Sequence, residues 1–163
     1  IGTAVTSFRT STKTVTPNLA PALGDVDLGS LTGFPFSNVN RDQVITVPVY
    51  INSDSAALQS FQIAVTYPTD VFLATSDSCT QGGDWIGVWG CTLNDPPGTV
   101  LIVGANMNSQ AQGGSLLVGQ FVLRATSTVA LNAQLTGSIM VMVRADGKDV
   151  PTTMVAGTVL VKV

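Results

Sequence analysis

The 163-residue sequence contains no histidine, and all ten of its acidic residues are aspartate. Without histidine, the Ser-His-Asp and Cys-His catalytic constellations are excluded, as are histidine-ligated metal sites. Glutamate favours helices whereas aspartate favours turns and caps, so the missing glutamate argues against a helical chain. We therefore predict a protein that is not an enzyme and that needs no metal or other cofactor.

Charged residues are also scarce, at 10% of the chain against roughly 25% in a typical soluble domain. The seven Lys and Arg residues are scattered singly and the net charge is −3. The sequence thus offers no phosphate-binding face, which excludes nucleic acid as a partner. Surface charge usually keeps a monomer soluble, so a surface this poor in charge must be covered in another way. The alternatives are neighbouring subunits, glycans, or a hydration layer on Ser, Thr, Asn and Gln side chains.

Long apolar runs are missing as well. None approaches the roughly 18 residues of a membrane-spanning helix, so we expect no transmembrane segment. The sequence begins at Ile1 without a signal-peptide pattern, which we interpret as a mature or excised form of a secreted protein. Its length predicts one domain with a full core.

Only two cysteines are present, Cys79 and Cys91, and they bracket a Gly-rich loop. This arrangement favours a disulfide formed in an oxidising compartment over two unlinked buried thiols. The loop also contains Trp85 and Trp89. Exposed, the two rings could stack on the sugar rings of a ligand. The alternative, which we favour, is that they close the end of the fold and pack beside the disulfide.

The clearest structural signal lies in residues 42–72. Apolar side chains alternate with other residues over 45–51 and again over 61–67, with a polar turn at 52–55 between them. Period-2 alternation is typical of strands with one face on a core. Two such strands joined by a helix-breaking turn predict an antiparallel unit.

Further strands are predicted over 100–107, 116–125, 129–144 and 154–163, with Gly137 interpreted as a bulge or bend. No segment shows helical periodicity. The sequence thus predicts an all-β, two-sheet antiparallel β-sandwich of jelly-roll or immunoglobulin-like type. Its buried core is predicted to include Val47, Val49, Phe61, Ile63, Val65, Phe121, Leu123, Ile139 and Val141.

Two segments precede the sandwich domain at 42–163. Residues 1–16 form a β-prone, Thr-rich extended arm, and residues 17–41 a Pro/Gly-rich apolar linker or ordered loop. Within that linker, the stretch at 24–29 has two carboxylates at calcium-loop spacing but lacks the third ligand and the downstream Glu, so we expect a turn. The apolar anchors of the arm are Val5, Phe8 and Val15, and its candidate O-glycosylation sites are Thr10, Thr12, Thr14 and Thr16.

The order of the strand motifs resembles cohesin-like domains, the β-sandwich modules that bind dockerins in cellulosomes and recur in other extracellular proteins. The resemblance covers about residues 43–163, and the corner after the second strand reads Tyr67-Pro68-Thr69-Asp70 where the family has a Tyr-Asp-Pro-like sequence. It implies a cohesin-like sandwich and an extracellular module that binds a protein or carbohydrate. The matching pieces are QVITVPVYI (43–51), SFQIAVTYPTDVF (60–72), GTVLIVGANM (98–107) and GGSLLVGQFVLRAT (113–126).

Three functions fit these observations. The leading hypothesis is a structural subunit of an extracellular polymer, a filament, appendage or surface layer, whose partners are copies of itself. Its arm would add as a strand to a sheet edge of a neighbour, although pairing within its own subunit is the alternative. The second hypothesis is a cohesin-like binding module that uses a flat apolar sheet face or the Trp loop. The third is an accessory domain of a larger enzyme.

Overall fold

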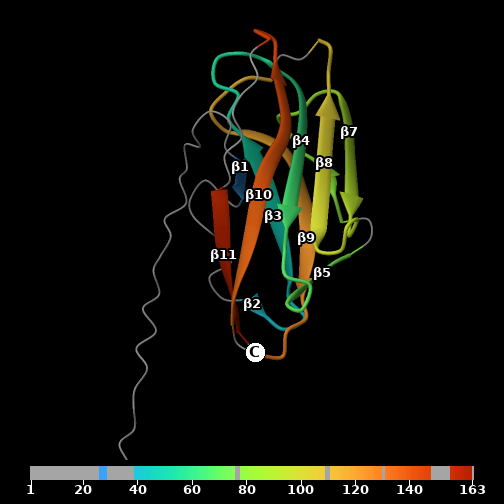
Figure 1. The fold of residues 1–163 in the computed structure, drawn as a ribbon, viewed down its shortest axis with the longest axis vertical. Helices are drawn as coiled ribbons and strands as arrows, with labels where there is room; N and C mark the ends of the chain where they lie inside the picture. The colour runs from blue at the N-terminus through green and yellow to red at the C-terminus, as the bar shows by residue number, and fades with distance from the viewer. Residues whose placement is uncertain are drawn as a thin grey trace, which may run out of the picture.

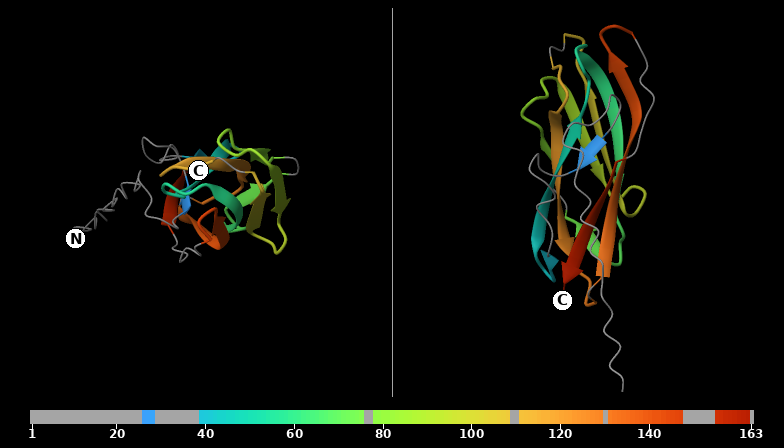
Figure 2. Two further views of the ribbon diagram at one scale, coloured as in Figure 1. Left: turned by 90° about the horizontal axis from the view of Figure 1, so that it is seen from above. Right: turned by 90° about the vertical axis from the view of Figure 1, so that its left-hand side faces the viewer.

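The computed structural model describes residues 26–28, 39–75, 78–108, 111–129, 131–147 and 155–162. They form two β-sheets packed face to face, which confirms the predicted all-β sandwich (Figure 1). The side view shows the two layers enclosing one core (Figure 2). Within the described residues, no helix is long and apolar enough to cross a membrane.

One sheet has the strand order β1-β3-β9-β5, and β6 also pairs along β9. Every pairing in this sheet is antiparallel. Its strands are β1 (Val26–Leu28), β3 (Val44–Ile51), β5 (Phe72–Ala74), β6 (Thr80–Gln81) and β9 (Leu116–Ala125).

The other sheet has the order β2-β11-β10-β4-β8-β7, and in Figure 1 it lies toward the viewer. Its pairings are antiparallel except that of β2 with β11, which is parallel. Its strands are β2 (Val39–Asn40), β4 (Leu58–Thr66), β7 (Val88–Leu93), β8 (Thr99–Ala105), β10 (Leu131–Arg144) and β11 (Val155–Lys162).

The predicted antiparallel unit over residues 42–72 is wrong in its pairing, because β3 and β4 lie in opposite sheets. β3 pairs with β9, whereas β4 lies between β10 and β8. The connection crosses from one sheet to the other, and within it Asp54 adopts a φ of 57° and forms an isolated bridge with Gly113. The alternation of apolar residues shows that one face of each strand is on the core. It does not show whether two strands pair within one sheet or lie in opposite sheets, because the pattern is the same in both cases.

Parts of the N-terminal region pair with the sandwich. The stretch predicted to turn at 24–29 instead contains β1, in which Asp27 pairs with Tyr50 of β3. The short strand β2 also falls within the predicted linker at 17–41. The arm at 1–16 lies outside the described residues, so its pairing and glycosylation stay predictions; this includes Val5, Phe8, Val15, Thr10, Thr12, Thr14 and Thr16.

Eight of the nine residues predicted for the core are buried, and Val141 is the exception at 42% exposed. The cause is an irregularity in the pairing of β10 with β4. Ile139 pairs with Ile63 and Val141 with Gln62, which leaves Met140 as an extra residue. A bulge of this kind reverses the facing of every later residue in the strand. The bulge predicted at Gly137 therefore lies three residues further on.

Tyr67 closes one end of the core, where its hydroxyl donates a hydrogen bond to Oδ1 of Asn94. Asn94 in turn donates from Nδ2 to the carbonyl oxygen of Ala74, at 3.4 Å. Burial raises the pKa of the Tyr67 phenol, while hydrogen bonds with Ala74 and Asn94 offset part of that rise. The neutral phenol is therefore the form that the folded state favours.

This shift predicts a loss of stability at alkaline pH. The pKa of Tyr67 in the folded protein is raised above its value of about 10 in the unfolded chain. The neutral phenol therefore contributes its full stabilisation below about pH 10, and this stabilisation is lost as the pH rises through the folded pKa. Urea unfolding from pH 8 upward should show this decline. Tyr67→Phe should unfold more easily at pH 8 but lose less stability on going to high pH. An equal alkaline loss in both proteins would contradict the assignment.

Candidate functional site

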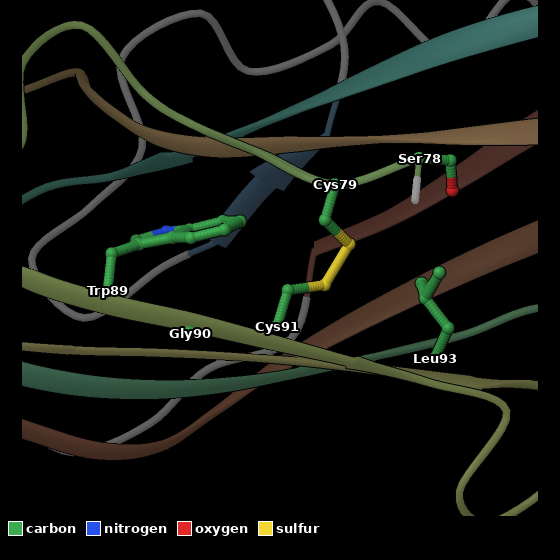
Figure 3. Close-up of a pocket in the computed structure, with 6 residues that line it drawn as sticks. All are labelled: Ser78, Cys79, Trp89, Gly90, Cys91 and Leu93. Atoms are coloured by element: carbon green, nitrogen blue, oxygen red, sulfur yellow. A yellow bond between two sulfur atoms is a disulfide. The ribbon is translucent and has the colours of Figure 1, made fainter. Parts of the chain in front are cut away.

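The Cys79–Cys91 disulfide lies at the side of the sandwich where β7 forms the end of the six-stranded sheet. The Cα atoms of the two cysteines are 6.3 Å apart. Cys79 immediately precedes β6, which pairs with β9 in the five-stranded sheet. Cys91 lies in β7, the last strand of the other sheet. The bond thus joins the two sheets where no strand of the described residues covers the gap (Figure 3).

Trp85 is 2% exposed, so its ring presents no face to a ligand. It packs edge-on against Phe61 with the ring centroids 4.9 Å apart, and its Nε1 donates to the carbonyl oxygen of Val88 at 3.1 Å. Room for both rings comes from Gly104, because a Cβ there would lie 2.3 Å from the Phe61 ring. The candidate role of Trp85 in sugar stacking is therefore replaced by a role in the core.

Trp89 is half-buried and packs against the core from β7. A Cβ at Gly119 would lie 3.2 Å from its ring, so this glycine allows the indole to approach β9 closely. Beside the ring is a hollow of about 350 Å³ that the disulfide crosses (Figure 3). The residues that line it are Ser78, Cys79, Trp89, Gly90, Cys91 and Leu93.

The outer face of the six-stranded sheet carries an uncharged surface that extends over four adjacent strands. We use "outer face" for the outward residues of β10, β4, β8 and β7, which lie side by side in four rows. None of them is charged, whereas the outward side of the five-stranded sheet exposes Arg124. The outer face consists of Val143, Ser60, Ala105, Val88, Val141, Gln62, Val103, Gly90, Ser138, Ala64, Leu101, Thr92, Thr136, Thr66 and Thr99, and of Met140, exposed at the bulge beside Val141.

Aliphatic side chains gather toward one end of the outer face. Val103 is 38% exposed at its centre, and Val88 and Val141 are exposed on the flanking strands. Ile86, two residues before β7, and Met107, two residues after β8, are exposed next to that end. These groups can bury apolar area and the Ser, Thr and Gln side chains can form hydrogen bonds, but the face offers no ionic contact.

Sequence reasoning anticipated a flat apolar sheet face as one possible site, without its residues. Val141 was predicted to be in the core, and only the bulge at Met140 turns it outward. The low charge of the chain was the signal for such a face. Within the described residues, no group of His, Cys, Asp or Glu side chains is arranged to hold a metal ion.

Comparison with known proteins identifies the fold. No protein-family model and no curated protein sequence matches the chain. Solved structures do match, and many of them are cohesin modules. The sixth cohesin of scaffoldin B from Acetivibrio cellulolyticus, in complex with the Cel5 dockerin, aligns with a TM-score of 0.65 and 14% identity over 85% of this chain and 96% of that one.

A Coh-OlpC–Doc435 complex from Clostridium thermocellum gives a TM-score of 0.64 and 12% identity over 88% of this chain and 96% of that one. A non-cellulosomal cohesin from the archaeon Archaeoglobus fulgidus gives 0.61 and 21% identity over 77% and 86%. The chain is thus a two-sheet β-sandwich. More particularly, its fold is cohesin-like, as the strand motifs implied.

Proposed function

We propose that the chain is a non-enzymatic, extracellular protein-binding module that uses its outer face to bind its partner. The observation that carries this proposal is the absence of charge from every outward position of four adjacent strands, together with exposed aliphatic side chains at Val88, Val103 and Val141. Charged residues are depleted at the centres of protein interfaces. The cohesins in two of the matched structures are complexed with dockerins, which supports a protein as the partner.

The chemistry of the outer face defines the partner that fits it. Val103 lies at its centre, between Gln62 of β4 and Gly90 of β7. An aliphatic side chain of the partner can pack there without desolvating a charge, while the amide of Gln62 and the hydroxyl of Ser60 accept or donate hydrogen bonds beside it. The partner should therefore present an uncharged surface with aliphatic anchors. An acidic or basic partner surface would lose solvation without gaining an ion pair.

The proposal predicts that Val103→Lys weakens partner binding by at least about tenfold, because the ammonium group would be buried without a counter-ion. Val103 is 38% exposed on the outward side of β8, so the substitution should leave the fold intact. The matched control is Leu73→Lys, since Leu73 is 50% exposed on the outward side of the other sheet. Both variants should melt within a few degrees of the wild-type protein.

Immobilised wild-type and variant proteins would be exposed to the secreted proteins of the source organism, and each retained protein would be purified and titrated by calorimetry. A partner that binds wild type and Leu73→Lys equally but Val103→Lys at least tenfold more weakly supports the outer face. A partner lost with Leu73→Lys and kept with Val103→Lys would place the site on the opposite sheet.

A second candidate is a structural subunit of an extracellular polymer, whose partner is another copy of the chain. It is favoured by the low charge, 10% of the residues, and by the exposed Ile86, Val88 and Met107 beside β7. A surface of this composition is easily covered by neighbouring subunits. Light scattering after size-exclusion chromatography separates the two candidates: species that grow with concentration favour the polymer, and a constant monomer favours the module alone.

A further inference from the structure

β7 has an unprotected edge. On one side it pairs with β8, and on the other side no strand of the described ranges pairs with it. Edge strands are usually protected by charged residues, by proline, by a bulge or by a covering segment. Val88–Leu93 contains no charged residue and no proline, whereas β3, which pairs with β1 only over 49–51, carries Pro48 in the part that β1 leaves unpaired. The register of β7 with β8 is also free of bulges.

The hollow beside the disulfide runs along the inner side of this edge. Trp89, Cys91 and Leu93 are the inward-facing residues of β7, and Ser78 and Cys79 face them from the opposite segment (Figure 3). A strand added next to β7 would direct every second side chain into the hollow and the others toward the outer face. The volume of about 350 Å³ is enough for an aromatic side chain next to Trp89.

The chain itself contains a segment suited to this edge. Residues 1–16 read IGTAVTSFRTSTKTVT, in which Ile1, Val5, Val15 and six threonines are β-branched. Such residues favour extended structure in sheets. In a strand, Phe8 shares a face with Thr6 and Thr10, while Ser7 and Arg9 point the other way.

We infer that the free edge of β7 accepts residues 1–16 of a second copy of the chain as an added antiparallel or parallel strand, with Phe8 in the hollow beside Trp89. Main-chain hydrogen bonds supply the affinity and the hollow supplies the specificity. The inference rests on the self-association proposed as the second candidate function, and it does not require the outer face.

A second copy suits this edge better than the chain's own arm. β1 follows the arm and pairs with β3 in the other sheet, while β7 is the far edge of the six-stranded sheet, so β1 and β7 lie on opposite sides of the sandwich (Figure 1). To reach its own β7, the chain would have to span the width of the sandwich, and fixing each residue of that crossing costs roughly 1–2 kcal/mol. A neighbouring β7 requires no such crossing. Arm and edge are different surfaces, so the contact repeats head to tail.

Cross-linking between two variants of the full chain tests this arrangement. One carries Ser7→Cys, on the arm face opposite Phe8, and the other carries Thr92→Cys, an exposed outward residue of β7. Mixed and treated with a short bismaleimide, they should give a two-chain product. Val44→Cys is the matched acceptor control and should give none; Val44 is exposed in β3, outside the stretch that pairs with β1. Phe8→Ala in the arm variant should reduce the product several-fold without changing the melting temperature of the sandwich.

Three results would overturn the inference: a product with Val44→Cys instead of Thr92→Cys, no product with either, or a chain carrying both Ser7→Cys and Thr92→Cys that links only to itself. A chain lacking residues 1–16 distinguishes two cases: the β7 edge does not accept the arm, or the chain does not self-associate at all. If it still forms oligomers in light scattering, another surface joins the copies and the edge is not the acceptor. If its oligomers disappear while the cross-link forms as expected, both the edge and self-association stand.

Discussion

Replacing Phe61 with alanine is expected to lower the free energy of unfolding by about 3–5 kcal/mol. Phe61 is buried in β4, which lies between β10 and β8 in the six-stranded sheet. Its ring packs edge-on against Trp85 and lies over Gly104 of β8, with which it is paired. Removing the ring leaves a cavity beneath Trp85, and Gly104 has no side chain to fill it.

The matched control is Val141→Ala, in the neighbouring strand β10. If the strand alternated without interruption, Val141 would face the core and its truncation would also be costly. The bulge at Met140 turns Val141 outward, so the change should remain within about 0.5 kcal/mol. Urea unfolding of both variants measures the difference. A loss above about 1.5 kcal/mol for Val141→Ala would place the bulge elsewhere.

The sequence was enough to predict which faces of most strands are buried. Alternation in residues 45–51 and 61–67 depends only on the period of the strand, and the buried faces of β3 and β4 follow it. The sequence did not predict which side chains of β10 after Ile139 face the core, because Ile139, Met140, Val141 and Met142 are all apolar. In such a run, one extra residue leaves no mark on the pattern, and only pairing with β4 reveals it.

The pairing of strands was less accessible from the sequence, since partners such as β3 and β9 are far apart in the chain. The same limit applied to the site. The scarcity of charge was visible at once, but only the registers of β10, β4, β8 and β7 bring the uncharged positions together. Trp85 and Trp89 lie in the same Cys79–Cys91 segment but differ in burial. Trp85 is buried in the core because Gly104 leaves room for its ring.

Breaking the Cys79–Cys91 disulfide is expected to cost about 3 kcal/mol of stability in the chain-entropy model. The two cysteines are 12 residues apart, and without the bond the unfolded chain regains the freedom of that loop. The bond also joins the segment before β6 to β7, so its loss removes a covalent link between the sheets at the edge next to Trp89. Urea unfolding of the wild-type protein with and without a reductant measures the change.

The Cys79→Ala/Cys91→Ala variant is the control for this experiment. It should be about as unstable as the reduced wild-type protein, and adding the reductant to it should change nothing. An unfolding midpoint of the wild type that does not respond to complete reduction, verified by thiol titration, would contradict the prediction. Because β7 forms the proposed acceptor edge, introducing Cys79→Ala/Cys91→Ala into the Thr92→Cys chain, which removes the bond without freeing thiols, should also lower its cross-link to the Ser7→Cys chain. The bond crosses the hollow in which Phe8 is proposed to bind (Figure 3).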